Sequence, residues 1–195
     1  MQPSPPLPRT AAPGHAAPSD WIVRWAHLVP PHGRVLDVAC GGGRHLRWFH
    51  ARGHAVIGVD RSGPEVAALA GLGELVCADI EQGPWPFAGR RFDAVVVAHY
   101  LWRPLLPTLV QSVAPGGVLL YETFAHGNGT VGRPSRPDFL LGPGELLDAC
   151  AGLRIVAYED GFLPSPERFV QRIAAVRQAP GDAPPRHPLV PPPPG

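Results

Sequence analysis

The chain has 195 residues, which is enough for one domain with a full hydrophobic core. Its 17 basic and 16 acidic side chains leave a formal charge of +1, which gives no electrostatic reason to expect a nucleic acid or a membrane surface as partner. Three widely spaced cysteines, no long apolar run and no apolar leader predict a cytoplasmic protein without a disulfide framework, a metal site or a transmembrane helix.

Both ends of the chain are rich in proline. Residues 1–18 and 179–195 carry few side chains that could fill a core, and this composition is typical of disordered or polyproline-like tails. We therefore place the folded domain in residues 19–178.

The first expected element is a helix that Ser19 can cap and that two prolines at positions 30 and 31 end. A spacing of three or four residues places its apolar side chains on one face. These side chains are Trp21, Ile22, Trp25 and Leu28.

Strands and helices then alternate along the chain. Apolar runs predict strands at residues 34–39, 55–60, 74–79, 92–100, 118–124, 153–162 and 167–177. Helices are expected at residues 43–52, 64–72, 104–114 and 142–150. Alternation of this kind favours an α/β fold with a doubly wound, parallel sheet, and the short link between the last two strands favours an antiparallel hairpin.

Three consecutive glycines separate the first strand from its helix. Gly41, Gly42 and Gly43 lack Cβ atoms, so a ligand can approach the main chain. In parallel sheets ligands bind beyond the carboxyl ends of the strands, and the start of a helix favours an anionic group there by about 0.3–2 kcal/mol. The hinge therefore predicts a ligand with a carboxylate or a phosphate.

Two acids end the next two strands, on the same edge of the sheet. Asp60 can accept hydrogen bonds from a ribose diol, each contributing about 1.5–3 kcal/mol. Asp79 can accept a hydrogen bond from an exocyclic amine such as that of adenine. Each acid could instead be an ordinary turn residue. Together they predict a ligand that contains a nucleoside.

A dinucleotide and S-adenosylmethionine both fit that description. The dinucleotide fingerprint needs a third small residue where this chain has Leu46. Asp37, within the first strand, would repel a pyrophosphate but attract the ammonium of a methionine moiety, unless it only caps the hinge. These two observations favour S-adenosylmethionine.

The segment DVACGGG (37–43) resembles the first motif of the class I S-adenosylmethionine-dependent methyltransferases, with Ala39 at the first glycine of that motif. Asp60 after VIGV matches the ribose-binding acid of the family, residues 78–80 match its adenine-contact segment, and APGGVLLYETF (114–124) resembles a later motif. Within the family the chain is most similar to small bacterial enzymes of the tellurite-resistance type. Ala39 suits the motif if its φ angle is negative.

The resemblance implies a Rossmann-like, seven-stranded, mostly parallel sheet of order 3-2-1-4-5-7-6 with one antiparallel strand. It also implies a set of residues that bind S-adenosyl-L-methionine: Asp37, Ala39, Cys40, Gly41, Gly43, Arg44, His45, Asp60, Arg61, Ala78, Asp79 and Ile80. His99 and Tyr100 follow the fourth strand, where the family places the methyl acceptor, and are predicted to be catalytic.

The expected activity is in-line methyl transfer to a small molecule, with an oligomeric state left open. Holding the reactants in line contributes about 7–11 kcal/mol, so a thiol or selenol acceptor needs little acid–base catalysis. An alcohol or amine acceptor needs a base, for which His99 is the candidate. The alternatives are an NAD(P)-dependent oxidoreductase and a non-catalytic module that binds S-adenosylmethionine. The long loop at residues 125–142 could act as a lid.

Overall fold

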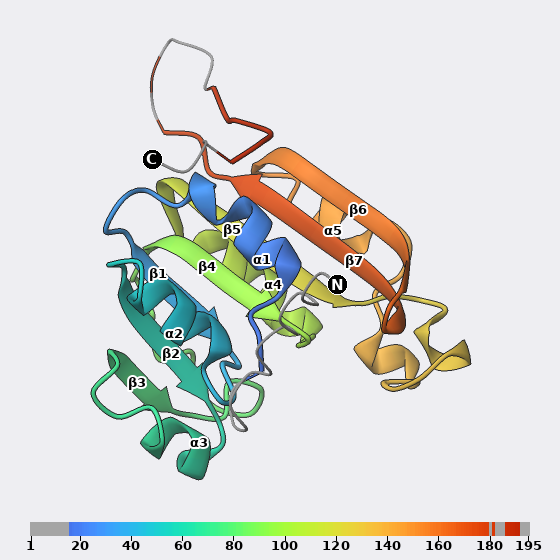
Figure 1. Cartoon of the computed structure of the whole chain (residues 1–195), viewed down its shortest axis with the longest axis horizontal. Helices are drawn as coiled ribbons and strands as arrows, with labels where there is room; N and C mark the ends of the chain where they lie inside the picture. The colour runs from blue at the N-terminus through green and yellow to red at the C-terminus, as the bar shows by residue number, and fades with distance from the viewer. Residues whose placement is uncertain (1–15, 180, 182–185, 192–195) are drawn as a thin grey trace, which may run out of the picture.

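A seven-stranded sheet forms the centre of the computed structural model, which describes residues 16–179, 181 and 186–191 (Figure 1). The strands are β1 (Arg34–Val38), β2 (Ala55–Asp60), β3 (Glu74–Cys77), β4 (Phe92–Ala98), β5 (Val113–Phe124), β6 (Arg154–Pro164) and β7 (Glu167–Val176). Their order is β3-β2-β1-β4-β5-β7-β6, with β7 antiparallel to both of its neighbours and all other pairs parallel. The predicted fold class, strand order and hairpin are therefore confirmed. The predicted tails fall largely outside the described residues.

The helices are shorter than predicted. They are α1 (Asp20–Trp25), α2 (Arg44–His50), α3 (Gly63–Ala67), α4 (Leu106–Gln111) and α5 (Glu145–Ala149). Four single 3-10 turns accompany them, at Ala26–Leu28, Arg103–Leu105, Asn128–Thr130 and Pro137–Phe139. The helix predicted at residues 64–72 cannot reach its predicted end, because Gly71 has a φ of +86°, which is incompatible with a helix.

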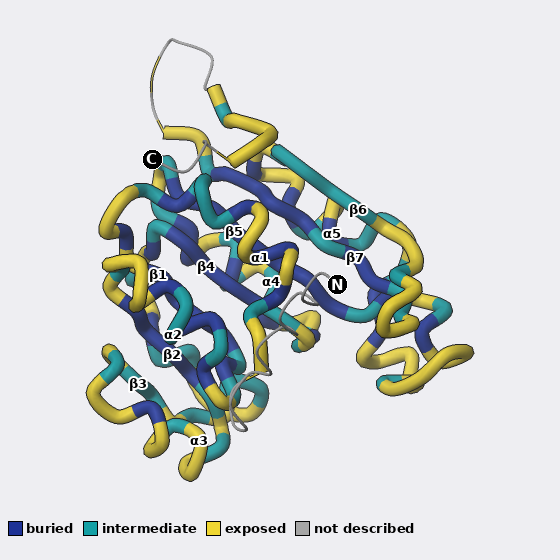
Figure 2. The backbone as a smooth tube through the Cα atoms, viewed as in Figure 1, coloured by how far each residue is buried: buried dark blue, intermediate teal, exposed yellow. Residues whose placement is uncertain are grey.

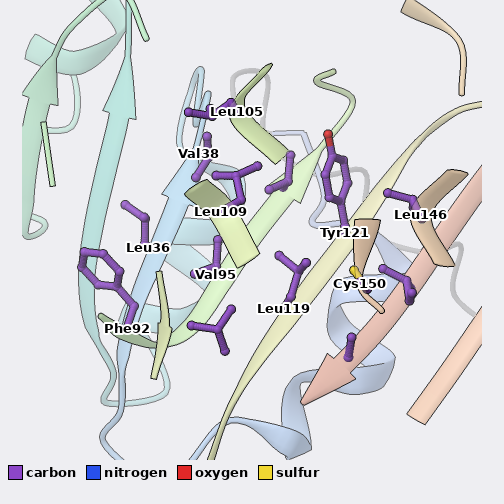
Figure 3. Packing of buried hydrophobic residues seen from close by; sticks show 14 of the residues in the cluster. Leu36, Val38, Phe92, Val95, Leu105, Leu109, Leu119, Tyr121, Leu146 and Cys150 are labelled. Atoms are coloured by element: carbon purple, nitrogen blue, oxygen red, sulfur yellow. The ribbon is translucent and has the colours of Figure 1, made fainter. Parts of the chain in front are cut away.

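The sheet buries both of its faces. Along the central strands alternate side chains point to opposite sides, so Leu36 and Val38 face one layer while Val35 faces the other. In Figure 3 the first layer packs Leu109 and Leu146, from α4 and α5, against the sheet. The second layer packs α1 and α2 through Trp21, Ile22, Trp25, Leu46 and Phe49. Figure 2 shows the central strands as the most deeply buried part of the chain.

Helix α1 begins as predicted, because the Ser19 hydroxyl accepts a hydrogen bond from the Trp21 N–H at 3.2 Å. The Trp21 indole N–H donates to the Ile173 carbonyl at 3.2 Å, which ties the helix to β7. Residues 16–19 then lie beside the glycine hinge that follows β1.

Candidate active site

The carboxyl ends of the five parallel strands β1 to β5 meet around a cavity of about 390 Å³, which we call the rim cavity. Six of the predicted cofactor residues line it: Ala39, Asp60, Arg61, Ala78, Asp79 and Ile80. The two predicted catalytic residues, His99 and Tyr100, line it as well. Residues predicted from separate strand ends are thus brought together at one site.

A second cavity, of about 360 Å³, lies over the glycine hinge and is called the hinge cavity. Its lining includes Asp37, Ala39, Cys40, Gly41, Arg44 and His45, all from the predicted set. Ala39 lines both cavities, so a ligand that spans them passes over this residue.

The hinge backbone differs from the expectation in one respect. The φ angle of Ala39 is +53°, so the condition under which alanine suits the glycine motif, a negative φ, is not met. The chain turns out of β1 through a left-handed residue at this point. The left-handed conformation destabilises a non-glycine residue by about 1–2 kcal/mol. Strain of this size is typical of a backbone held for a function.

Gly43 was predicted to contact the cofactor, but it lies on the lining of neither cavity. Its φ is +71°, and a Cβ atom added to it would lie 2.5 Å from Cδ2 of Leu69, a buried side chain. Gly42, in contrast, lines the hinge cavity, and an added Cβ would meet no atom within 4 Å. Gly43 therefore serves the packing of the hinge, and Gly42 leaves room for a ligand.

Replacing Gly43 with alanine should lower the free energy of unfolding by about 2–3 kcal/mol, from backbone strain and overlap with Leu69. The matched control is Gly89→Ala, because Gly89 has a φ of +74° and open space around its missing Cβ. The control should lose only about 1 kcal/mol, the backbone contribution. Urea unfolding of both variants measures the difference, and equal losses would show that Leu69 moves aside at no cost.

Asp60 ends β2 and lines the rim cavity with a carboxylate whose two oxygens already bind the main chain. Oδ2 accepts from the Gly41 N–H at 2.8 Å, and Oδ1 accepts from the Ser62 N–H at 2.9 Å. Each carboxylate oxygen has a second acceptor position. Asp60 can therefore fix the hinge and bind two hydroxyl groups at once.

Asp37 is 2% exposed, and its Oδ2 atom is buried without a hydrogen-bond partner among the described residues. Within the part of the chain that the structure describes, no hydrogen bond from the hinge to the Asp37 side chain supports the predicted alternative that Asp37 caps the hinge. Its neighbour is Nδ1 of His45, 3.7 Å from Oδ2. Because His45 Nε2 accepts from the Ser19 N–H at 3.1 Å, the imidazole proton is assigned to Nδ1 and faces Asp37. An unpaired buried carboxylate oxygen beside a cavity fits a cationic ligand group.

Asp79 is exposed beyond the end of β3, where its Oδ1 accepts from the N–H groups of Glu81 and Gln82 at 2.9 and 3.1 Å. The side chain thus organises the turn that presents Ala78 and Ile80 to the rim cavity. A structural role is therefore visible, and contact with an exocyclic amine stays a prediction.

His99 has a φ of +58° and uses both ring nitrogens in contacts. Nδ1 lies 3.3 Å from Nη2 of Arg44, and Nε2 lies 3.7 Å from Oε1 of Glu122. Burial lowers the pKa of the His99 imidazole, and the Arg44 guanidinium lowers it further, while the Glu122 carboxylate raises it. The lowered pKa favours the neutral ring at pH 7, with Nδ1 facing Arg44 and Nε2 facing Glu122.

Tyr100 carries a hydroxyl group that has no hydrogen-bond partner within the described ranges. Burial raises the pKa of this hydroxyl, and the nearby Glu81 carboxylate raises it further. A neutral phenol on the cavity wall can donate one hydrogen bond to a ligand. Cys40 has a thiol whose pKa burial also raises, which matches a small apolar hinge residue better than a nucleophile.

Several lining residues escaped prediction. The rim cavity is also lined by Glu81, Leu101, Thr123, Phe124, Pro134 and Phe139. Two of these come from the loop at residues 125–142, whose Asn128 side chain bonds the Pro134 carbonyl and the Phe169 N–H. Arg103 also holds the loop, through the carbonyls of residues 138 and 140. These bonds fix the loop against the sheet in the structure, and the predicted role as a lid stays a prediction.

Across the described ranges, no three His, Cys, Asp or Glu side chains lie close enough together to hold a metal ion. No helix among those residues has the length and apolar character needed to cross a bilayer.

Comparisons with known proteins agree with the arrangement of the strands. The model of a family described as a methyltransferase domain matches residues 35–117. Thiopurine S-methyltransferase from Pseudomonas fluorescens is 30% identical over 146 residues, which cover 73% of this chain and 63% of the relative. The chain thus spans less than two thirds of that relative.

Solved structures with a similar fold include TehB from Haemophilus influenzae, with a TM-score of 0.63 and 19% identity over 78% of this chain and 60% of TehB. A methyltransferase from Methanosarcina mazei that depends on S-adenosylmethionine has a TM-score of 0.64 and 13% identity, over 85% of this chain and all of the other. At these identities the likeness concerns the fold alone.

Proposed function

We propose that the chain, whose residues 35–117 match the model of a methyltransferase domain, is a class I S-adenosylmethionine-dependent enzyme that transfers a methyl group from S-adenosylmethionine to a small-molecule acceptor. The observation that carries the proposal is the pair of cavities joined at Ala39. The charged side chains of the hinge cavity complement the ammonium and the carboxylate of an amino acid. The rim cavity carries the acids that are expected to bind a nucleoside.

The residues present fit the cofactor. The unpaired Oδ2 atom of Asp37 would accept from the ammonium of the methionine moiety, and the Arg44 guanidinium would bind its carboxylate. Asp60 would accept from the ribose hydroxyls through the free positions of its two oxygens. The segment from Ala78 to Ile80 would contact the adenine. When bound, S-adenosylmethionine supplies a methyl group activated by a sulfonium.

The chain's own contribution to the transfer is positioning. The hinge and Asp60 hold the donor side, while Phe124, Pro134 and Phe139 narrow the acceptor side and exclude water. These three apolar side chains suit a small acceptor with a flat or apolar body.

The acceptor atom we propose is a sulfur or selenium that ionises easily. The lone pair of His99 Nδ1 faces the Arg44 guanidinium at 3.3 Å, so this residue offers the cavity no free base. A thiol or selenol needs no such base near neutral pH. The similarity to a thiopurine S-methyltransferase is consistent with a sulfur acceptor.

Calorimetry should show micromolar binding of S-adenosylhomocysteine, and incubation with S-adenosylmethionine and a panel of small aromatic thiols should give products heavier by one methylene. The matched panel of alcohols and amines should give at most traces. Binding of NADH without binding of S-adenosylhomocysteine would favour the oxidoreductase alternative and refute the proposal. Binding of S-adenosylhomocysteine without any methylated product would favour a non-catalytic module that binds S-adenosylmethionine.

A further inference from the structure

A series of polar contacts connects the hinge cavity to a carboxylate buried behind the rim cavity. It begins at Arg44, passes through His99 and ends at Glu122, which is 1% exposed. Glu122 is itself fixed, since Oε1 accepts from the Ser19 hydroxyl at 2.9 Å and Oε2 accepts from Arg172 at 3.2 Å. The Glu122 carboxylate, at the buried end of this series of contacts, is therefore held in place.

The direction of the hydrogen bond between Arg44 and His99 follows from the chemistry of the two groups. A guanidinium only donates, so His99 Nδ1 must carry a lone pair toward Arg44. The imidazole proton is then assigned to Nε2, which faces the Glu122 carboxylate. At 3.7 Å the Glu122 carboxylate is beyond hydrogen-bond distance, but its negative charge favours the tautomer of His99 that can accept from Arg44.

Arg44 has donors to spare for a ligand. Of its five N–H bonds, one faces His99 and one donates to the Ala17 carbonyl at 3.5 Å, which leaves three donors on the same planar group. It lines the hinge cavity together with Asp37, so the cavity carries one cationic and one anionic side chain. This pair complements the carboxylate and the ammonium of an amino acid.

We propose that His99, held by Glu122, is a positioning residue that directs Arg44 toward the carboxylate of the methionine moiety. The proposal rests on the proposed function, because it assumes that S-adenosylmethionine occupies the two cavities. It assigns to His99 a part in cofactor binding in place of proton abstraction from the acceptor.

Three variants of His99 separate positioning from general structure. His99→Phe keeps a ring but offers no acceptor to Arg44, and His99→Gly removes the side chain at a φ of +58° that glycine adopts freely. His99→Asn is the conservative control, because asparagine tolerates this φ and has an oxygen near the position of Nδ1.

The probes are S-adenosylhomocysteine and 5′-methylthioadenosine, which share the adenosine but differ in the amino-acid part. His99→Phe and His99→Gly should each weaken S-adenosylhomocysteine about tenfold, the scale of one charge-assisted hydrogen bond, and leave 5′-methylthioadenosine unchanged. His99→Asn should stay within about threefold of the wild type for both probes. In an Arg44→Met background the change to His99→Gly should have no further effect.

Each other result has a defined meaning. Equal weakening of both probes, or an undiminished effect of His99→Gly after Arg44→Met, would show a structural role and overturn the inference. Unchanged binding of S-adenosylhomocysteine to His99→Phe and His99→Gly would also overturn it, while leaving the proposed function intact. If the wild type binds neither probe, the proposed function itself fails.

Discussion

Replacing Asp60 with alanine will weaken binding of S-adenosylhomocysteine about 30-fold, which corresponds to about 2 kcal/mol. The substitution removes the acceptors proposed for the ribose hydroxyls. It also removes the bonds that hold the N–H groups of Gly41 and Ser62, so the hinge loses its support. Calorimetry on the purified variant measures the loss.

The matched control is Asp93→Ala. Asp93 also binds a main-chain group, the Arg34 N–H at 2.7 Å, but Arg34 begins β1 and so lies at the opposite edge of the sheet from the rim cavity. This control should bind S-adenosylhomocysteine like the wild type while losing a similar amount of stability. Equal affinities for the two variants would refute the assignment of Asp60 to the ribose.

Asp37→Asn will make the free protein more stable and the ligand complex weaker. The wild-type carboxylate is 2% exposed, and its Oδ2 has no hydrogen-bond partner among the described residues, so removing the charge should raise the free energy of unfolding by about 1 kcal/mol. Affinity for S-adenosylhomocysteine should fall about tenfold, because the ammonium loses its charged acceptor. Urea unfolding with and without ligand measures both effects in one experiment.

Glu122→Gln provides the comparison, since Glu122 is equally buried but has partners on both oxygens. Here loss of the charge weakens the buried pair with Arg172, which keeps only Glu159 as a charged partner, and the free energy of unfolding should fall by about 1–3 kcal/mol. If Asp37→Asn were as destabilising as Glu122→Gln, the Asp37 carboxylate would be a structural group and not a ligand acceptor.

Much of the fold could be predicted because it follows from patterns of residues that are close together in the sequence. Ser19 followed by apolar residues at helical spacing predicted α1 and its cap, and the short link after Phe162 predicted the β6–β7 hairpin. The position of β7 inside the sheet came only from the resemblance to a family, since pairing between distant strands leaves no local signal. The ends of the helices were missed, because glycines and 3-10 turns stop them earlier than their apolar pattern suggests.

The site was predictable where a rule of topology applied. The carboxyl ends of parallel strands lie at the same edge of the sheet, so Asp60 and Asp79 could be placed together from the sequence alone. Gly43 could not be distinguished from Gly42, because the difference depends on Leu69, a residue brought near only by folding. The contacts of Glu122 with Ser19 and His99 join residues that are 103 and 23 positions apart in the sequence, and no local sequence pattern indicates them.

The place of β7 has a consequence for synthesis of the protein. This strand pairs with β5 on one side and β6 on the other, although it follows both along the chain. A ribosome therefore releases β5 with one edge unpaired, and that apolar edge can recruit strands from other nascent chains until residues 167–176 emerge. A chaperone that shields β5 during this interval would raise the yield of folded protein more than one that acts after release.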